Sequence, residues 1–358
     1  MMTSRVAPFS INGRLIGPGE PVYVIAEISS NHGQSYAAAE ALVRGAHAAG
    51  ADAVKLQTYT PDTITIDSDA PAFVQGGGSL WKGTTLHQLY RTAYMPWEWQ
   101  PRLKAVADEL GIDCFSSPFD ATAVDFLLAM DVPAFKIASF ELVDLPLIRL
   151  VAATGRPMIM STGMATVDEI DEAVRAARVG GAADIALLKC TSAYPSPPES
   201  THLPAIPAMA ARWGLPVGLS DHTQGAAVPA AAVALGAVIV EKHITTSHAD
   251  ATPDEAFSLD LAEFAEMVAT IRVVERAMAS GPLIGPTAEE EESRRFRRSL
   301  FVVEDIAPGE PFTERNVRSI RPAAGLHTRE YERVLGRRAA VAIARGTPLA
   351  WDLVEPEG

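Results

Sequence analysis

Eight short apolar segments, each followed by a stretch with helical periodicity, occupy the chain up to residue 243. A strand that is apolar along its whole length is buried on both faces, as in a parallel sheet covered by helices. Eight such units predict an α/β fold of the (β/α)8 or TIM barrel type, with an active site at the carboxyl ends of the strands. The predicted strands are residues 22–27, 53–57, 112–116, 134–138, 158–161, 185–190, 217–220 and 238–243.

The connections between these strands support the same fold. Residues 37–50 are alanine-rich and end in glycine, and Thr166 with Glu169 forms a capping box that predicts a helix through Arg178. Residues 59–96 form a long insertion after the second strand, and its position on the catalytic face predicts a substrate-covering element. The insertion contains Gly76, Gly77, Gly78 and Trp81.

The alternation of strands and helices ends near residue 280. A last helix is expected from Leu261 to about Ala279, after which the glycine- and proline-rich residues 281–286 break the periodicity. Short β-type segments follow, and residues 305–311 resemble residues 342–348. We therefore expect a catalytic barrel of residues 1–283, a linker of residues 284–296 and a small β-rich domain of residues 297–358. A domain of that size is expected to serve as a lid or an assembly module.

Composition excludes several classes of partner. The net charge of −14 over 358 residues argues against general binding to nucleic acid or an anionic membrane, although a local cationic cleft is still compatible with it. No apolar run reaches the roughly 20 residues that a membrane span needs. Cys114 and Cys190 both fall inside predicted strands, which predicts core residues and no disulfide. We expect a cytoplasmic protein.

Two lysines interrupt apolar strands. Lys55 and Lys136 must point into the mouth of the barrel and meet an anion, because a buried unpaired ammonium group is very costly. They predict a clamp for a phosphate or carboxylate, the alternative being structural ion pairs. A ring of hydroxyl groups at the ends of strands three to seven suits a phosphorylated ligand. Its members are Ser116, Ser117, Ser139, Ser161, Thr191, Ser192 and Ser220.

Two histidines close neighbouring strands. His222 follows the seventh strand and His243 ends the eighth, so their imidazoles could share a divalent metal that acts as a Lewis acid. The alternative is a general acid or base beside a core histidine. Glu27 and Glu141 are the carboxylates available for proton transfer or water activation. Tyr194 and Asp254 add polar groups from later loops, either as ligand contacts or as hydrogen-bond partners of other site residues.

Motifs along nearly the whole chain resemble the sialic acid synthase family, whose members carry a barrel and a C-terminal antifreeze-like (SAF) domain. In the barrel these are Ile25-Ala26-Glu27, Asn31-His32-Gly33, residues 50–58, Ser116-Ser117-Pro118-Phe119, Lys136-Ile137-Ala138-Ser139, Ser161-Thr162-Gly163-Met164, residues 189–195, residues 218–222 and Glu241-Lys242-His243. In the small domain they include Arg298-Ser299-Leu300, Gly309-Glu310, Asn316-Val317 and Arg321-Pro322.

The resemblance implies a transferase, dependent on Mn2+ or Mg2+, that condenses phosphoenolpyruvate with an amino-sugar aldehyde. It places the metal on His222 and His243 and gives Glu27, Glu141 and Lys136 catalytic roles. It places the acceptor sugar on Gln57, Tyr194 and Asp254, with Arg321 reaching across from the partner of a domain-swapped homodimer. It places phosphoenolpyruvate on Lys55, Ser117, Lys136, Ser139, Ser161, Ser192 and Ser220. Ser117 and Ser192 stand where relatives often have threonine and asparagine.

Within the family, the chain most resembles the pseudaminic acid synthases. Phe140 follows Ser139 where sialic and legionaminic acid synthases more typically have glycine, and the insertion has the pseudaminic pattern. N-acetylneuraminate or legionaminate synthesis is the alternative within the family. A Schiff-base aldolase that uses Lys55 or Lys136 with pyruvate, and a non-catalytic sugar-binding scaffold, are the alternatives outside it.

Overall fold

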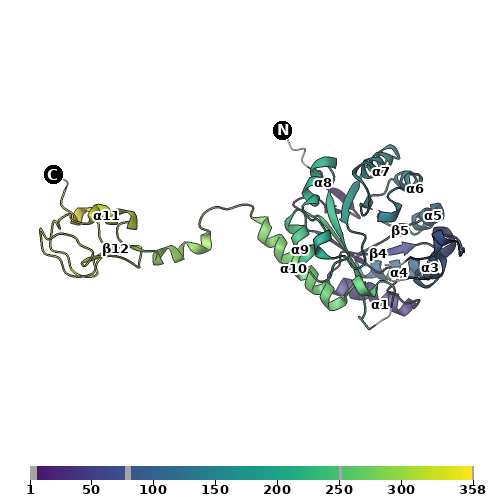
Figure 1. Cartoon of the computed structure of the whole chain (residues 1–358), viewed down its shortest axis with the longest axis horizontal. Helices are drawn as coiled ribbons and strands as arrows, with labels where there is room; N and C mark the ends of the chain where they lie inside the picture. Colours follow the sequence, from purple (N-terminus) through teal and green to yellow (C-terminus); the bar gives the residue numbers. More distant parts are fainter. Residues whose placement is uncertain (1–5, 77–81, 250–251, 357–358) are drawn as a thin grey trace. The chain divides into compact units, whose positions relative to one another are not determined.

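The computed structural model describes residues 6–76, 82–249 and 252–356. The chain divides into two compact units, Met1–Ala279 and Ser280–Gly358, each of which is described by itself (Figure 1). Gly77, Gly78 and Trp81, which the sequence places in the insertion, lie outside the described residues.

The first unit is a closed barrel of eight parallel strands, as predicted. Each strand pairs with the next, and β10 pairs with both β9 and β3, which closes the sheet. Each observed strand coincides with a predicted segment to within two residues at either end. The strands are β3 (Tyr23–Glu27), β4 (Ala53–Thr58), β5 (Asp113–Pro118), β6 (Phe135–Ile137), β7 (Met158–Ser161), β8 (Ile185–Cys190), β9 (Val217–Asp221) and β10 (Ile239–Thr245).

Helices cover the outside of the barrel (Figure 1). The capping box predicted for the helix after β7 is present, since the Glu169 amide donates to Thr166 Oγ1 and the Thr166 amide donates to the Glu169 carboxylate. The helix after β10 has its predicted bounds. The helices are α1 (Tyr36–Ala48), α4 (Gln100–Leu110), α5 (Ala121–Ala129), α6 (Leu145–Ala152), α7 (Val167–Val179), α8 (Ala205–Trp213), α9 (Ala227–Ala234) and α10 (Leu261–Ala279).

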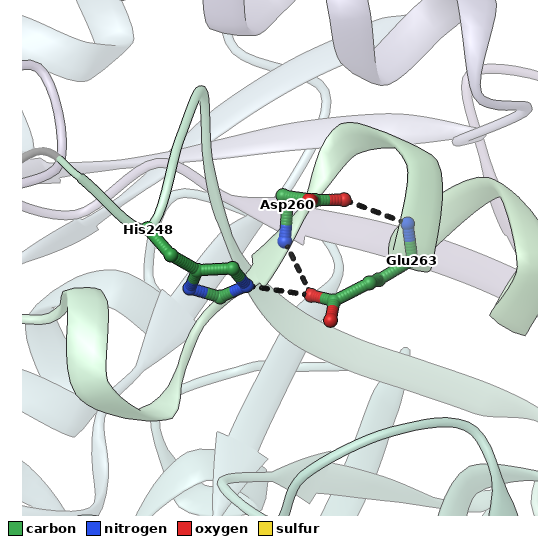
Figure 2. A group of neighbouring side chains, drawn as sticks. All are labelled: His248, Asp260 and Glu263. Atoms are coloured by element: carbon green, nitrogen blue, oxygen red, sulfur yellow. Dashed lines mark hydrogen bonds and ion pairs between the residues drawn. The ribbon is translucent and has the colours of Figure 1, made fainter.

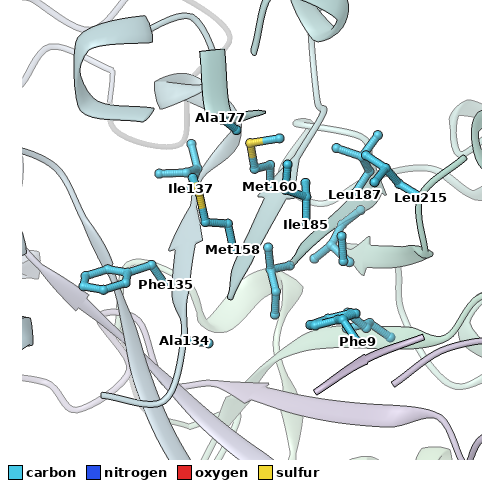
Figure 3. Packing of buried hydrophobic residues seen from close by; sticks show 14 of the residues in the cluster. Phe9, Ala134, Phe135, Ile137, Met158, Met160, Ala177, Ile185, Leu187 and Leu215 are labelled. Atoms are coloured by element: carbon cyan, nitrogen blue, oxygen red, sulfur yellow. The ribbon is translucent and has the colours of Figure 1, made fainter. Parts of the chain in front are cut away.

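A short hairpin precedes the barrel and was not predicted. Its strands, β1 (Phe9–Ile11) and β2 (Arg14–Ile16), are antiparallel. Asn12 donates to Asp113 at the start of β5, so the hairpin lies at the amino ends of the barrel strands. Phe9, Ile11 and Ile16 are buried in the main core cluster, part of which Figure 3 shows. The apolar side chains of the hairpin therefore close the end of the barrel that lies opposite the predicted site.

Alternation along the strands separates the inside of the barrel from the outside. The register pairs Glu27 with Lys55 and His243, and it pairs Glu241 with Ser220, so these residues share one face of the sheet. The inner residues nearer the hairpin, such as Ile25 and Phe115, are apolar. The barrel thus has an apolar floor and a polar layer at the carboxyl ends of its strands.

The insertion after β4 contains α2 (Pro61–Ile64), the 3-10 turn η1 (Pro71–Phe73) and α3 (Leu86–Ala93). Thr60 with Thr63 and Thr85 with Gln88 form capping boxes that begin the two α-helices. Tyr59, directly after β4, contacts Phe119 after β5 and Tyr90 of α3, with ring centroids 5.1 and 5.5 Å apart. These contacts place α3 over the carboxyl end of the barrel.

The second unit has its own apolar core and little regular structure. β12 (Ser299–Val302) pairs antiparallel with β13 (Val317–Ile320), and α11 (Tyr331–Val334) is one turn long. The two similar segments meet at equivalent positions, since Ile306 and Ile343 exchange backbone hydrogen bonds of 2.8 and 2.9 Å. Both are buried beside Leu300, Phe312 and Val317.

Cys114 in β5 and Cys190 in β8 are buried free thiols, as predicted. Within residues 6–76, 82–249 and 252–356, no helix has both the length and the apolar character needed to cross a membrane.

Candidate active site

Four buried charges meet inside the barrel. Lys55 forms an ion pair with the Glu27 carboxylate, and its Nζ lies 3.6 Å from Glu241 Oε1. Lys136 Nζ lies 2.9 Å from the same Glu241 oxygen. Each lysine therefore has a buried carboxylate partner, which meets the requirement that buried charges be paired. Both predicted lysines point into the barrel.

Glu241 was not singled out as a site residue, although the sequence holds a signal for it. In Glu241-Lys242-His243 the side chains alternate, so the first and third point inward and Lys242 points outward, where it pairs with Asp221 at 2.7 Å. Burial raises the pKa of Glu241, but Lys136 and Lys55 outweigh this and hold the pKa below its ordinary value. Glu241 is thus an anion held between the two lysines.

Most of the predicted hydroxyl groups join this layer. Ser117 lies 3.4 Å from Lys55 Nζ, and Ser220 lies 3.4 Å from Glu241 Oε1. Ser161 is on the inner face by register, and its buried Oγ has no hydrogen-bond partner among the described residues. Ser139 and Ser192 approach each other across Gly163, where a Cβ would lie 2.8 and 2.2 Å from their hydroxyl oxygens.

Two members of the predicted hydroxyl ring are directed elsewhere. The Ser116 hydroxyl lies 2.6 Å from that of Thr58, which in turn donates to Gln100 of α4. Ser116 therefore faces the outer helices, because it is one residue out of phase with Ser117. Thr191 donates to the carbonyl of Ser200 in the following loop. The prediction that these two hydroxyls converge on the ligand is wrong.

The two predicted metal ligands lie side by side. The rings of His222 and His243 are 5.3 Å apart, and Phe257 packs against both, at 5.8 and 5.0 Å. His222 Nδ1 donates to the Thr191 carbonyl at 3.0 Å. Burial lowers the pKa of His222, but the Cys190 thiol and the Thr191 carbonyl outweigh this and raise the pKa above its ordinary value, so a metal would bind at Nε2 by displacing a proton. His243 Nδ1 is buried and has no hydrogen-bond partner among the described residues.

These two imidazoles fit a divalent metal with an open coordination sphere. Burial and the nearby charges of His222, Lys55 and Lys136 lower the pKa of His243 well below its ordinary value, so its ring is neutral at pH 7. A neutral ring with an unpartnered buried nitrogen is a suitable ligand. Among the residues that the structure describes, groups of three or more ligating side chains occur only elsewhere, at His248, Asp260 and Glu263. Two protein ligands leave most positions to water and substrate.

The predicted carboxylates occupy different environments. Burial is the main cause that raises the pKa of Glu27 to about 7, although Lys55 opposes it, and Gln57 Nε2 donates to Glu27 Oε1 at 3.1 Å. Glu141 lies in the 3-10 turn η3 (Ser139–Glu141) after β6. Burial raises its pKa to about 7, and its Oε2 is unpartnered within the described part of the chain. A carboxylate with such a pKa can exchange a proton near neutral pH.

Asp254 and Tyr194 border the histidines. Asp254 accepts a hydrogen bond from Ser29, and its carboxylate lies 3.8 Å from His243 Nδ1. The Tyr194 ring lies 4.6 Å from the His222 ring. Ser29 also receives a hydrogen bond from Gln57 at 2.9 Å, so the predicted acceptor-binding residues Gln57, Asp254 and Tyr194 form one side of the site.

An open pocket of about 880 Å³ lies between the insertion and the loop after β10, and it is lined by the chain neighbours of Asp254 and not by Gln57, Tyr194 or the two histidines. Its lining includes Gln34 after β3, Lys82 and Gln88 of the insertion, and Thr252 and Glu255 of the loop after β10. The insertion thus forms part of the wall of this pocket. Arg321, the remaining predicted residue, lies in the second unit and is exposed there.

The comparisons with known proteins agree with this geometry. A model of the NeuB family matches residues 42–282 and a model of the SAF domain matches residues 297–355. The chain belongs to the NeuB family. Enzymes of this family are phosphoenolpyruvate-dependent nonulosonic acid synthases, and the chain is a transferase of this class. The family is typically metal-dependent, and its substrates are phosphoenolpyruvate and an amino sugar.

Individual members of the family differ in their similarity to the chain. The pseudaminic acid synthase of Helicobacter pylori is 41% identical over 94% of this chain and 98% of its own length. The N,N'-diacetyllegionaminic acid synthase of Legionella pneumophila is 32% identical over 95% of this chain and 96% of its own. The crystal structure of N-acetylneuraminic acid synthetase from Leptospira borgpetersenii matches with a TM-score of 0.72 and 28% identity, covering 80% of this chain and 95% of that chain.

Proposed function

We propose that the chain is a pseudaminic acid synthase. It would condense phosphoenolpyruvate with 2,4-diacetamido-2,4,6-trideoxy-L-altrose to give pseudaminic acid and phosphate. The observation that carries the choice of acceptor is the greater similarity to the pseudaminic than to the legionaminic acid synthase. Phe140 also supports it, because it follows Ser139 at the position where sialic and legionaminic acid synthases more typically have glycine.

The charges inside the barrel support the donor half of the reaction. Phosphoenolpyruvate carries a phosphate and a carboxylate, and Lys55 and Lys136 are the cations in the polar layer that could receive them. Ser117 and Ser220 lie beside this charged group, and Ser139, Ser161 and Ser192 supply further hydroxyl donors. The phosphate and carboxylate of the ligand would displace Glu241 from part of its contact with the lysines.

The acceptor half is assigned to the opposite side of the site. Gln57, Tyr194 and Asp254 would hold the open-chain sugar, with Glu27 orienting Gln57. Mn2+ or Mg2+ held by His222 and His243 would act as a Lewis acid toward the aldehyde oxygen. By analogy with the family, Arg321 of the partner subunit would contact an acetamido group in a domain-swapped homodimer. We further assign the protein to the cytoplasm, and we divide the chain as predicted at residues 283 and 296.

The reaction forms one carbon–carbon bond and releases phosphate by carbon–oxygen cleavage. C3 of phosphoenolpyruvate attacks the aldehyde carbon, and water then adds to C2. Glu141 is the base that accepts the proton of this water, because its unpartnered Oε2 and its pKa of about 7 suit that role. Collapse of the tetrahedral centre breaks the bond from C2 to the phosphate oxygen and leaves a nine-carbon 2-keto acid.

A panel of acceptor sugars tests the proposal. Phosphate release from phosphoenolpyruvate is measured with the altrose derivative, N-acetylmannosamine and the legionaminic precursor, each with Mn2+ and with chelator. We expect metal-dependent release with the altrose derivative, and at most about 1% of that rate with the other two, because the acceptor pocket rejects the wrong stereochemistry. Release that is fastest with another sugar would overturn the acceptor assignment and keep the chemistry.

Gly163 provides a separate test of the phosphoenolpyruvate site. In Gly163→Ala the new Cβ would force the hydroxyls of Ser139 and Ser192 to rotate away. Rotating two serines costs little stability, about 1 kcal/mol each, but it withdraws two donors from the ligand. We expect the KM for phosphoenolpyruvate to rise about tenfold, with an unchanged KM for the acceptor as the internal control. A rise in the acceptor KM alone would place these hydroxyls in the acceptor site.

A further inference from the structure

The loop after β10, the last strand of the barrel, contributes to the site. It is described over residues 246–249 and 252–258, and we refer to it as the β10 loop. It contributes Asp254 to the acceptor side, Phe257 to the packing of both histidines, and Thr252 and Glu255 to the pocket wall. Its position therefore decides how well the acceptor side is formed.

His248 of this loop lies between two carboxylates, as Figure 2 shows for one of them. Its Nδ1 is 2.7 Å from Glu255 Oε1, and its Nε2 is 2.8 Å from Glu263 Oε2. A carboxylate only accepts, and a neutral imidazole has only one N–H. Both contacts are satisfied at once when the ring is an imidazolium, which has no lone pair left to bind a metal. We call this arrangement, in which His248 joins Glu255 to Glu263, the His248 clamp. It explains the group of His248, Asp260 and Glu263 better than a metal site does.

One end of this clamp is rigid. Glu263 lies in the first turn of α10, where its amide donates to Asp260 Oδ1 at 2.8 Å and its carboxylate accepts from the Asp260 amide at 2.9 Å. The next residues of α10 are anchored by the buried Phe264 and Met267. The other end, Glu255, is next to Asp254 in the chain and lines the pocket. The clamp therefore holds Glu255, and with it the adjacent Asp254, in place relative to α10.

We propose that His248 is a positioning residue for acceptor binding, which holds Asp254 and the pocket wall in place by joining Glu255 to Glu263. The role of Asp254 in this statement rests on the proposed function. Other contacts also hold the β10 loop, namely Gln224 to the Ala256 carbonyl at 2.7 Å and Asn31 to Ser258 at 2.7 Å. Loss of the clamp thus loosens the loop without unfolding it.

The clamp depends on pH. The charged groups that face His248 are Glu255 of the 3-10 turn η5 (Glu255–Phe257), Glu263 of α10 and Asp260 of β11 (Leu259–Asp260). Hydrogen bonds to Glu263 and Glu255 raise the pKa of His248 above its ordinary 6.5. The clamp is therefore complete below about pH 6.5 and is lost as the pH rises through the raised pKa.

Hydrogen exchange of residues 252–258, corrected for intrinsic rates, tests the clamp without any substrate. We compare wild type, His248→Gln, which is neutral, and His248→Lys, which keeps a charge at all pH values used. Between pH 6 and 9 we expect protection of the loop to fall about tenfold in the wild type, to stay high in the lysine variant and to stay low in the glutamine variant. His47→Gln, an exposed histidine on α1, is the matched control and should follow the wild type.

Kinetics then test the positioning role. His248→Gln should raise the KM for the acceptor about five- to tenfold at pH 6.5 while kcat and the KM for phosphoenolpyruvate stay within twofold, and His248→Lys should restore the acceptor KM. Unchanged exchange in His248→Gln, or changed exchange with an unchanged acceptor KM, would overturn the proposal. If no acceptor of the panel gave phosphate release, the proposed function would be contradicted instead. The hydrogen-exchange data would still show whether the clamp exists.

Discussion

Lys136→Met is expected to lower kcat/KM at least about a thousandfold, a loss of about 4 kcal/mol of transition-state stabilisation. The variant keeps the volume of the side chain but removes one of two cations from a water-excluded layer. Glu241 then keeps Lys55 as its only lysine partner, so the site loses one positive charge that would face the anionic substrate. Steady-state phosphate release over a range of phosphoenolpyruvate concentrations measures the effect.

Two variants separate this role from a general loss of charge. Lys136→Arg keeps the cation and should retain more activity than the methionine variant, although the guanidinium group does not match the geometry of the ammonium. Lys104→Met removes a lysine that pairs with Asp108 on the surface of α4 and should behave as wild type. If a folded Lys136→Met enzyme turned over at near-normal rates, Lys136 would have no place in the phosphoenolpyruvate site.

Removal of the metal is expected to have an effect of similar size. Chelation should reduce phosphate release at least about a thousandfold, and added Mn2+ or Mg2+ should restore it. His243→Ala should show the same loss without rescue, because its neutral buried ring is one of only two protein ligands assigned to the metal. Mn2+ binding can be measured by electron paramagnetic resonance, because the signal of the free ion is lost when it binds. This readout is independent of turnover.

The group at His248 serves as the control for this measurement. His248→Gln should bind Mn2+ as tightly as the wild type, because in the wild type His248 pairs with Glu255 and Glu263 and is not a metal ligand. If His243→Ala bound Mn2+ as tightly as the wild type and His248→Gln did not bind it, the metal site would have to be assigned to the exposed group at His248. Both assignments would then be contradicted. The two variants therefore distinguish the two places where ligating side chains gather.

Much of the fold could be predicted because its determinants are local. Strands buried on both faces are apolar throughout, so each barrel strand was visible in the sequence. The capping box of Thr166 and Glu169 lies within four residues, and the structure confirms it. The hairpin of β1 and β2 was missed because two strands of three residues leave almost no periodic signal.

The candidate site was predictable to the extent that it follows strand ends. Lys55, Lys136, His222 and His243 are all at the inner layer that the barrel implies. Ser116 was misplaced because alternation along β5 was not applied to it, although the sequence holds that information. The same alternation along β10 puts Glu241 on the inner face with His243.

The sequence by itself determined the barrel, its caps and the residue types that reach its mouth, because periodicity and chain order are local properties. Only the tertiary structure decided which charges meet. Lys136 and Glu241 are 105 residues apart in the chain, and no local pattern relates them. Nor does the sequence show that burial raises the pKa of Glu141 to about 7 or that His248 joins Glu255 to α10. Ion pairing and desolvation depend on distance in space, which is defined only when the strands have closed around the site.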